Sequence, residues 1–204
     1  MKTVRKTLVL AACAILLVCA TVVGTLAYLT ATATVQNTFT VGNVSITMDE
    51  TDVDNSTPNM DRDTENKYKL LPGQAYTKDP VIHVDTESED CYVFVKVTNN
   101  ISEVEAEDNT IVSQMEKNGW MLVPGTSNVY YQPNAVKGGT NVPVFANFTV
   151  RSDADADDLN KVAGQTIVVE AYAVQAAGFK ADEDGTPAAV VAWNTTFGAA
   201  GAQG

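Results

Sequence analysis

The stretch Cys91–Asn99, CYVFVKVTN, decides the fold of this chain. Its side chains alternate, so that a cysteine and three valines share one face. The opposite face begins with two aromatic rings and ends with Lys96 and Thr98. Alternation with a period of two is typical of a β-strand. One fully apolar face and one mixed face are expected of a strand in a β-sandwich that is covered mainly on one side.

Other segments extend this pattern along the chain. Residues 166–174 form a second strong candidate strand, with apolar residues alternating against Glu170 and Tyr172. Shorter candidate strands lie at residues 38–48, 67–71, 80–84, 120–123, 128–132 and 142–151. The segment 80–84 is expected near a sheet edge because Pro80 cannot donate a ladder hydrogen bond. About eight strands separated by turns predict an all-β fold, a jelly-roll-like β-sandwich with short peripheral helices.

The peripheral helices are expected at three places. Residues 110–118 end at Gly119 and predict one short helix, and residues 152–161 predict a turn or a single helical turn. Residues 187–198 begin with proline and end with glycine, as a short helix does. In this last segment Ala189, Trp193 and Phe197 follow one another at a spacing of four residues. They therefore form an apolar stripe that can pack on the domain.

The N-terminus has the composition of an export signal. Three basic residues among the first six are followed by an apolar run, and Thr25 and Ala27 are the small residues that a signal peptidase requires. We expect cleavage between Ala27 and Tyr28; the alternative is an uncleaved membrane anchor. The expected organisation is a signal peptide at 1–27, an N-terminal segment at 28–37, a β-sandwich domain at 38–178, and an acidic linker, short helix and flexible tail at 179–204.

Charge and cysteine content narrow the function classes. Without residues 1–27 the chain has ten Lys and Arg against 25 Asp and Glu, a formal net charge of 10 − 25 = −15. Such a charge disfavours nucleic acids and anionic lipids as partners. Cys13 and Cys19 fall within the signal, so Cys91 has no cysteine in the remaining chain with which to pair. We expect Cys91 to be a buried, inert thiol, and the fold to depend on its core instead of on disulfides.

No motif predicts catalysis. The chain has a single histidine, His83, and lacks the H-E-x-x-H helix that supplies two zinc ligands. It also lacks a G-x-S-x-G motif and a glycine-rich phosphate loop. No spacing brings His83 toward Cys91 or the carboxylates, so we expect it to be a strand residue with its ring at the surface. The sequence predicts a protein without catalytic, cofactor-binding or metal-binding residues.

Acidic loops suggest calcium as the one alternative ligand. Asp153, Asp155 and Asp157 have the spacing of the first three oxygen ligands in a calcium loop, but glycine is missing at the sixth position and glutamate at the twelfth. The acidic residues at 49–54 and 182–184 match the pattern less well. We expect solvated loops at all three places, and the segment 49–66 is expected to be mobile. Weak collective calcium binding stays open as an alternative.

Several segments together resemble the TasA/camelysin family of exported Gram-positive proteins. They are AYLT at 27–30, NTFTVGNVSITMDE at 37–50, LPGQAYTKDP at 71–80, EDCYVFVKV at 89–97, VVEAYAVQAAGF at 168–179 and AWNTTFG at 192–198. They span nearly the whole chain after the signal, in the order found in the family. The resemblance implies processing by a signal peptidase of the SipW type and secretion to the extracellular matrix or cell surface of a Gram-positive bacterium.

The resemblance also implies assembly into biofilm fibres by donor-strand exchange. In this mechanism the N-terminal segment of one copy completes a sheet of the next, which satisfies unpaired edge groups. The candidate self-assembly segment is uncharged and free of glycine and proline; it consists of Tyr28, Leu29, Thr30, Ala31, Thr32, Ala33, Thr34, Val35, Gln36 and Asn37. The expected partners are other copies of the chain and other matrix or cell-surface proteins. The alternatives are a camelysin-type cell-surface metalloendopeptidase and a monomeric surface-binding module, and the segment then is an edge strand of its own domain or a frayed terminus.

Overall fold

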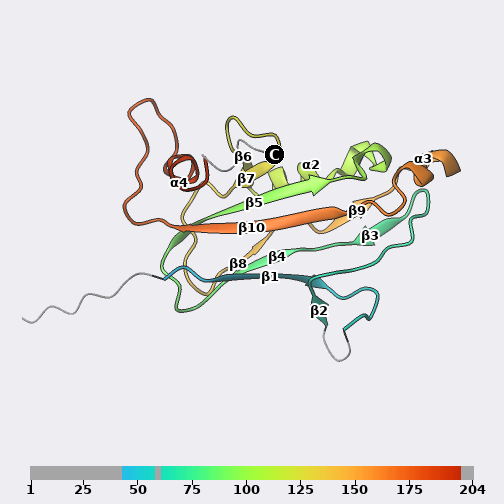
Figure 1. Cartoon of the computed structure of the whole chain (residues 1–204), viewed down its shortest axis with the longest axis horizontal. Coiled ribbons are helices and arrows are strands. Elements are labelled where there is room, and N and C mark those ends of the chain that lie inside the picture. Colours follow the sequence, from blue (N-terminus) through green and yellow to red (C-terminus); the bar gives the residue numbers. More distant parts are fainter. Residues whose placement is uncertain (1–42, 58–60, 199–204) are drawn as a thin grey trace, which may run out of the picture. The chain divides into compact units, whose positions relative to one another are not determined.

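A computed structural model describes residues 43–57 and 61–198, and in this part the chain is mostly strand with a few short helices (Figure 1). The predicted β-rich fold is therefore confirmed. Sheet 1 has the strand order β2 (Arg62–Asp63), β1 (Ile46–Thr51), β4 (Val81–Val84), β8 (Asn141–Pro143). Sheet 2 has the order β10 (Ile167–Gln175), β5 (Cys91–Asn99), β7 (Val129–Tyr131), β6 (Met121–Leu122). A separate antiparallel pair joins β3 (Ala75–Thr77) to β9 (Asn147–Thr149).

The two strongest predicted strands form the longest ladder of the fold. Strands β5 and β10 pair antiparallel along their whole length, from Ile167 opposite Asn99 to Gln175 opposite Cys91. Figure 1 shows them side by side across the domain. On the other edge of β5 lies β7, which forms a hairpin with β6 around a turn at Pro124-Gly125. The period-two pattern was sufficient to find β5 and β10 because each has one face against the main core.

The main core lies between sheet 1 and sheet 2. The valine and cysteine face of β5 points into it, and Cys91, Val93 and Val95 are fully buried. From sheet 1 the inward residues Ile82 and Val84 of β4 and Val142 of β8 join the same cluster. The prediction that Cys91 is buried is therefore confirmed.

A second, smaller core lies on the outer face of sheet 2. Helix α4 (Ala188–Thr196) covers the aromatic end of β5, where Phe94 is fully buried. Trp193 packs against Phe94 with ring centroids 5.1 Å apart and against Phe197 with centroids 4.8 Å apart. Tyr172 of β10 completes the aromatic group. The apolar stripe predicted for residues 187–198 thus does pack on the domain.

Short helices occupy the long connections. Helix α2 (Ile111–Lys117) is capped by Thr110, whose side chain accepts a hydrogen bond from the backbone of Ser113. The helix buries two apolar side chains. Helix α3 (Ala156–Lys161) begins with a capping box made by Asp155 and Asp158. Two 3₁₀ turns precede α2, η1 (Ser102–Val104) and η2 (Glu107–Asn109). Among the described residues no helix is long and apolar enough to cross a membrane.

The single strand predicted at residues 142–151 is wrong, because the chain leaves sheet 1 after Pro143 and resumes as β9 in another pair. Polar side chains satisfy the backbone where the ladder is interrupted. Asn118 donates to the carbonyl of Val144, and Gln114 Oε1 accepts from the amides of Ala146 and Asn147. Side chains of α2 and its C-cap therefore replace the missing strand partner.

Three further predictions of local structure are corrected. Residues 67–71 form no strand; Tyr68 and Leu70 pack against the main core from a loop instead. Strand β4 is not at an edge, because Pro80 lies just before it and β1 and β8 flank it. Residues 49–51, predicted as part of a mobile loop, continue β1, and the segment predicted at 38–48 is a strand only from Ile46 onward among its described residues.

Candidate functional site

The predicted processing site and self-assembly segment lie outside the described residues. This holds for Ala27, Tyr28 and the whole segment 28–37. The chain is described from Asn43, three residues before β1 begins at Ile46. The described residues do contain a groove that such a segment could occupy.

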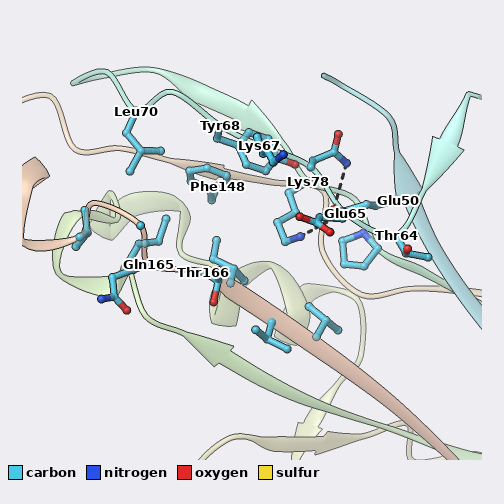
Figure 2. A pocket seen from close by; sticks show the side chains of 18 of the residues that line it. Glu50, Thr64, Glu65, Lys67, Tyr68, Leu70, Lys78, Phe148, Gln165 and Thr166 are labelled. Carbon is cyan, nitrogen blue, oxygen red and sulfur yellow. Dashed lines mark hydrogen bonds and ion pairs between the residues drawn. The ribbon is translucent and has the colours of Figure 1, made fainter. Parts of the chain in front are cut away.

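A groove of about 870 Å³ opens between β1 and the first three residues of β10. Its floor is the inner face of the two strands, where Met48 of β1 and Ile167 and Val169 of β10 contact the main core. Figure 2 shows Tyr68, Leu70 and Phe148 along one wall and Gln165 and Thr166 at the start of β10. Five of these apolar side chains are only half-buried, because no described strand covers the gap between the sheets.

The edge of β10 beside this groove has no strand partner among the described residues. Two backbone hydrogen bonds at the ends of the ladder with β5 show which residues are bonded across it. Asn100 donates to the carbonyl of Thr166, and Ala176 donates to the carbonyl of Asp90. Hydrogen-bonded residues alternate along an antiparallel pair, so the even-numbered residues of β10 bond to β5. The amides and carbonyls of the odd-numbered residues therefore point to the open edge: Ile167, Val169, Ala171, Ala173 and Gln175.

The same odd-numbered residues carry the side chains that face the main core. Ile167, Val169, Ala171 and Ala173 all pack against it while half-buried. A strand added at this edge would thus gain backbone hydrogen bonds and apolar burial together. The opposite edge of the groove offers less, because β2 already pairs with the last two residues of β1.

One end of the groove carries a buried ion pair. Lys78 Nζ lies 2.7 Å from Glu50 Oε2, and the two side chains are only 12% and 6% exposed. Asn66 donates a further hydrogen bond to Glu50 at 3.2 Å. Figure 2 shows this pair pointing into the groove. Burial, and then the nearby carboxylates of Glu50 and Asp79, raises the pKa of Tyr68 beside it, so the phenol stays neutral.

The acidic residues that were considered as alternative calcium ligands mostly serve the fold. Asp153 pairs with Arg151 at 3.0 Å, and Asp155 caps α3. Asp184 accepts the backbone amide of Thr186 in an exposed turn. The spacing of residues 153–157 is therefore explained by a helix start, which favours the same carboxylates as a calcium loop does.

One group of three carboxylates does come together among the described residues. Oxygen atoms of Asp52, Asp54 and Asp63 lie within 4.8 Å of one another. They accept hydrogen bonds from the backbone of Ser56 and from Ser56 Oγ. Two of the three belong to the acidic stretch 49–54 noted in the sequence. Asp63 was not identified, because only the pairing of β2 with β1 brings it near.

His83 lies in β4 as predicted, but its ring is not simply at the surface. Nδ1 lies 2.8 Å from Asn141 Oδ1, and Nε2 lies 3.1 Å from Asp49 Oδ2. The sequence spacing gave no sign of this contact with a carboxylate. The alternation of TMDET at 47–51 was the available signal, because it continues β1 and places Asp49 on the same face as Thr47, opposite His83.

Comparison of the chain with protein-family models, with curated proteins and with solved structures found no match. The functional argument therefore proceeds from the groove, the open edge of β10 and the sequence.

Proposed function

We propose that this protein is a structural subunit of an extracellular matrix, which associates with other copies by donating its segment 28–37 to the groove of the next subunit. The observation that carries the proposal is the open edge of β10, where Ile167 and Val169 present free backbone groups and half-covered apolar side chains together. Edges of this kind pair readily with extended segments. The proposal assigns the protein no catalytic role.

The sequence of the segment suits the groove. Leu29, Ala31, Ala33 and Val35 alternate with Tyr28 and three threonines, so an extended conformation has one apolar face and one hydroxyl-rich face. The groove is lined by the first three residues of β10, Ile167, Val168 and Val169, and the open edge of this strand continues to Gln175. The nine residues of β10 span about 30 Å at the rise of a β-strand, a length that nine of the ten residues of the segment can match. We assign the apolar face to the groove and the threonines to solvent.

The remaining parts of the proposal rest on the sequence and its family resemblance. Cleavage after Ala27 by a peptidase of the SipW type frees the segment outside a Gram-positive cell. A jelly-roll topology is the specific form proposed for the β-rich fold, with the donated strand beside β10. The segment itself has no charged side chain, so its insertion adds no repulsion to the net charge of each copy.

Truncation tests the self-association. A chain that begins at Tyr28 is compared with one that begins at Thr38, by sedimentation velocity and electron micrographs at equal concentration. We expect the longer chain to form oligomers or fibres and the shorter chain to sediment as a monomer with an unchanged circular dichroism spectrum. Monomers in both samples, under all salt concentrations tested, would favour the surface-binding module instead.

A pair of matched substitutions tests which face enters the groove. The substitution Ala33→Asp places a carboxylate on the apolar face, and Thr32→Asp places the same charge on the hydroxyl face. We expect A33D to abolish assembly, because an unpaired charge is buried, and T32D to retain most of it. Equal loss from both variants would contradict an inserted strand, and the reverse order would place the threonine face in the groove.

A further inference from the structure

His83 occupies the centre of the outer face of sheet 1. It lies on β4, opposite Thr47 of β1 on one side and opposite Asn141 of β8 on the other. The chain has no other histidine. A change in the protonation of this ring therefore acts where three strands meet, and it is the one imidazole titration in the protein.

Both nitrogens of the ring face oxygen atoms. Nδ1 lies 2.8 Å from Asn141 Oδ1, so this nitrogen carries the proton in the orientation that the Asn141 amide has. Nε2 is shielded from solvent, lies 3.1 Å from Asp49 Oδ2 and has no aligned hydrogen-bond partner within the described part of the chain. In the neutral ring an Nε2 lone pair would face a carboxylate. In the imidazolium both nitrogens are donors, and the contact with Asp49 becomes an ion pair.

The neighbouring charges favour the protonated ring. Arg62 of β2 pairs with Asp49 and, at 3.1 Å, with Asp79, so two carboxylates share one guanidinium. A charged His83 balances this group, whereas a neutral ring leaves it with a net negative charge. The contact with Asp49 and then that with Asn141 raise the pKa of His83, while burial and Arg62 act against them.

We propose that proton binding to His83 locks β1 to β4, so that sheet 1 is held more tightly below neutral pH than above it. The sign follows from linkage. A histidine whose pKa is higher in the folded protein stabilises it fully below the unfolded pKa, near 6.5, and this stabilisation is lost as the pH rises through the folded pKa. Because β1 also forms part of the groove floor, the proton secures this part of the groove.

Titration of the imidazole by NMR tests the lock directly. In the full chain we expect the pKa of His83 to be higher in the folded protein than in the same protein unfolded in urea. Asp49→Asn removes the facing charge and should lower the folded pKa. Arg62→Gln removes the opposing cation and should raise it. A folded pKa equal to or below that in urea, or shifts in the opposite directions, would overturn the proposal.

The stability measurement uses His83→Gln as its control. The urea midpoint of the wild-type chain should fall between pH 6 and pH 8.5 by more than that of H83Q, which has no group to titrate at this position. A second control, Asn141→Ala, keeps the ion pair and should retain a pH-dependent midpoint. Parallel curves for wild type and H83Q would show that the proton does not stabilise sheet 1, and would contradict the proposal.

Discussion

The outer faces of the two sheets are stabilised by different kinds of interaction. On sheet 1, Arg62 joins β1, β2 and the loop before β4 through ion pairs with Asp49 and Asp79, whose side chains are about one third exposed. On sheet 2, helix α4 covers the sheet with Trp193 and other rings, and Trp193 is only 5% exposed. One face therefore depends on charge and hydrogen bonding, and the other on apolar burial.

This difference determines how each face should respond to its surroundings. Ion pairs near a surface contribute little singly and weaken as salt increases. Buried aromatic packing is insensitive to salt and pH, and its loss leaves a cavity. We therefore expect the aromatic face to give the largest mutational effects and the charged face to give the effects that vary with conditions.

The largest effect is expected from Trp193→Ala. Removal of the indole empties the contact with Phe94 and Phe197, and we expect unfolding to become easier by about 4 kcal/mol. Urea unfolding followed by circular dichroism measures the change. Asn194→Ala, on the exposed side of the same helix, is the matched control and should have little effect. A loss below about 1 kcal/mol for W193A would mean that α4 contributes little to the stability of sheet 2.

The next largest effect should come from the buried pair in the groove, which shares features of both faces. Lys78→Met leaves Glu50 in the core without its cation, at a cost of about 3 kcal/mol. The double substitution Glu50→Leu with Lys78→Met removes both charges and should recover most of the loss. Urea midpoints of the two single variants and the double variant give the coupling. If the double variant does not recover the lost stability, the ion pair itself stabilises this site, and the loss in Lys78→Met is not due to an isolated buried charge.

Arg62→Ala should have a smaller effect, about 1.5 kcal/mol, because its partners remain partly solvated. This loss of stability should depend on the salt concentration. The loss should shrink between 0.05 and 0.5 M salt, whereas that of W193A should not. The salt series in urea therefore separates the two faces.

The same variant should change the response to acid. Burial would raise the pKa of Asp49 and Asp79, but hydrogen bonds, including those from Arg62, outweigh it and hold both pKa values below the usual range. Their contribution is present above the unfolded pKa of about 4 and is lost as the pH falls through the folded pKa. Wild type should thus lose stability on acidification more steeply than R62A. Identical slopes would contradict this assignment.

Tyr172→Phe should have the smallest effect. Among the described residues the hydroxyl donates only to Glu170, at 3.3 Å near the surface, whereas the ring centroid lies 5.7 Å from that of Trp193. Since the ring is retained, we expect a change within about 0.5 kcal/mol. A larger loss in a urea titration would mean that hydrogen bonding also contributes on the aromatic face.

The sequence alone was sufficient to predict the elements whose apolar residues recur with a regular period and pack on one side. Strands β5 and β10, helix α2 and the stripe of α4 follow from spacing alone, since each has a buried face of regular period. The break after Pro143 could not be predicted in this way. It depends on Gln114 and Asn118, which lie far from it in the sequence and take the place of a strand partner.

The groove was less accessible to sequence reasoning than the segment proposed to fill it. The segment is local, and its composition is visible in ten consecutive residues. The groove depends on which edges of two sheets stay open, a property of the topology. Glu50 shows the same limit. The sequence predicts that it belongs to an acidic loop, whereas in the structure it is only 4% exposed and forms an ion pair with Lys78.

Because Cys91 is buried, the rate at which its thiol reacts reports how often the domain opens. Residues 28–204 contain no other thiol, and this one is fully buried between the sheets. Burial, and then the neighbouring carboxylate of Asp90, raises its pKa, which suppresses the reactive thiolate. A maleimide added to the folded chain 28–204 can therefore label Cys91 only when the sheets separate. The labelling rate counts these openings without any engineered probe, and a cysteine introduced at the surface can be modified selectively in the folded protein.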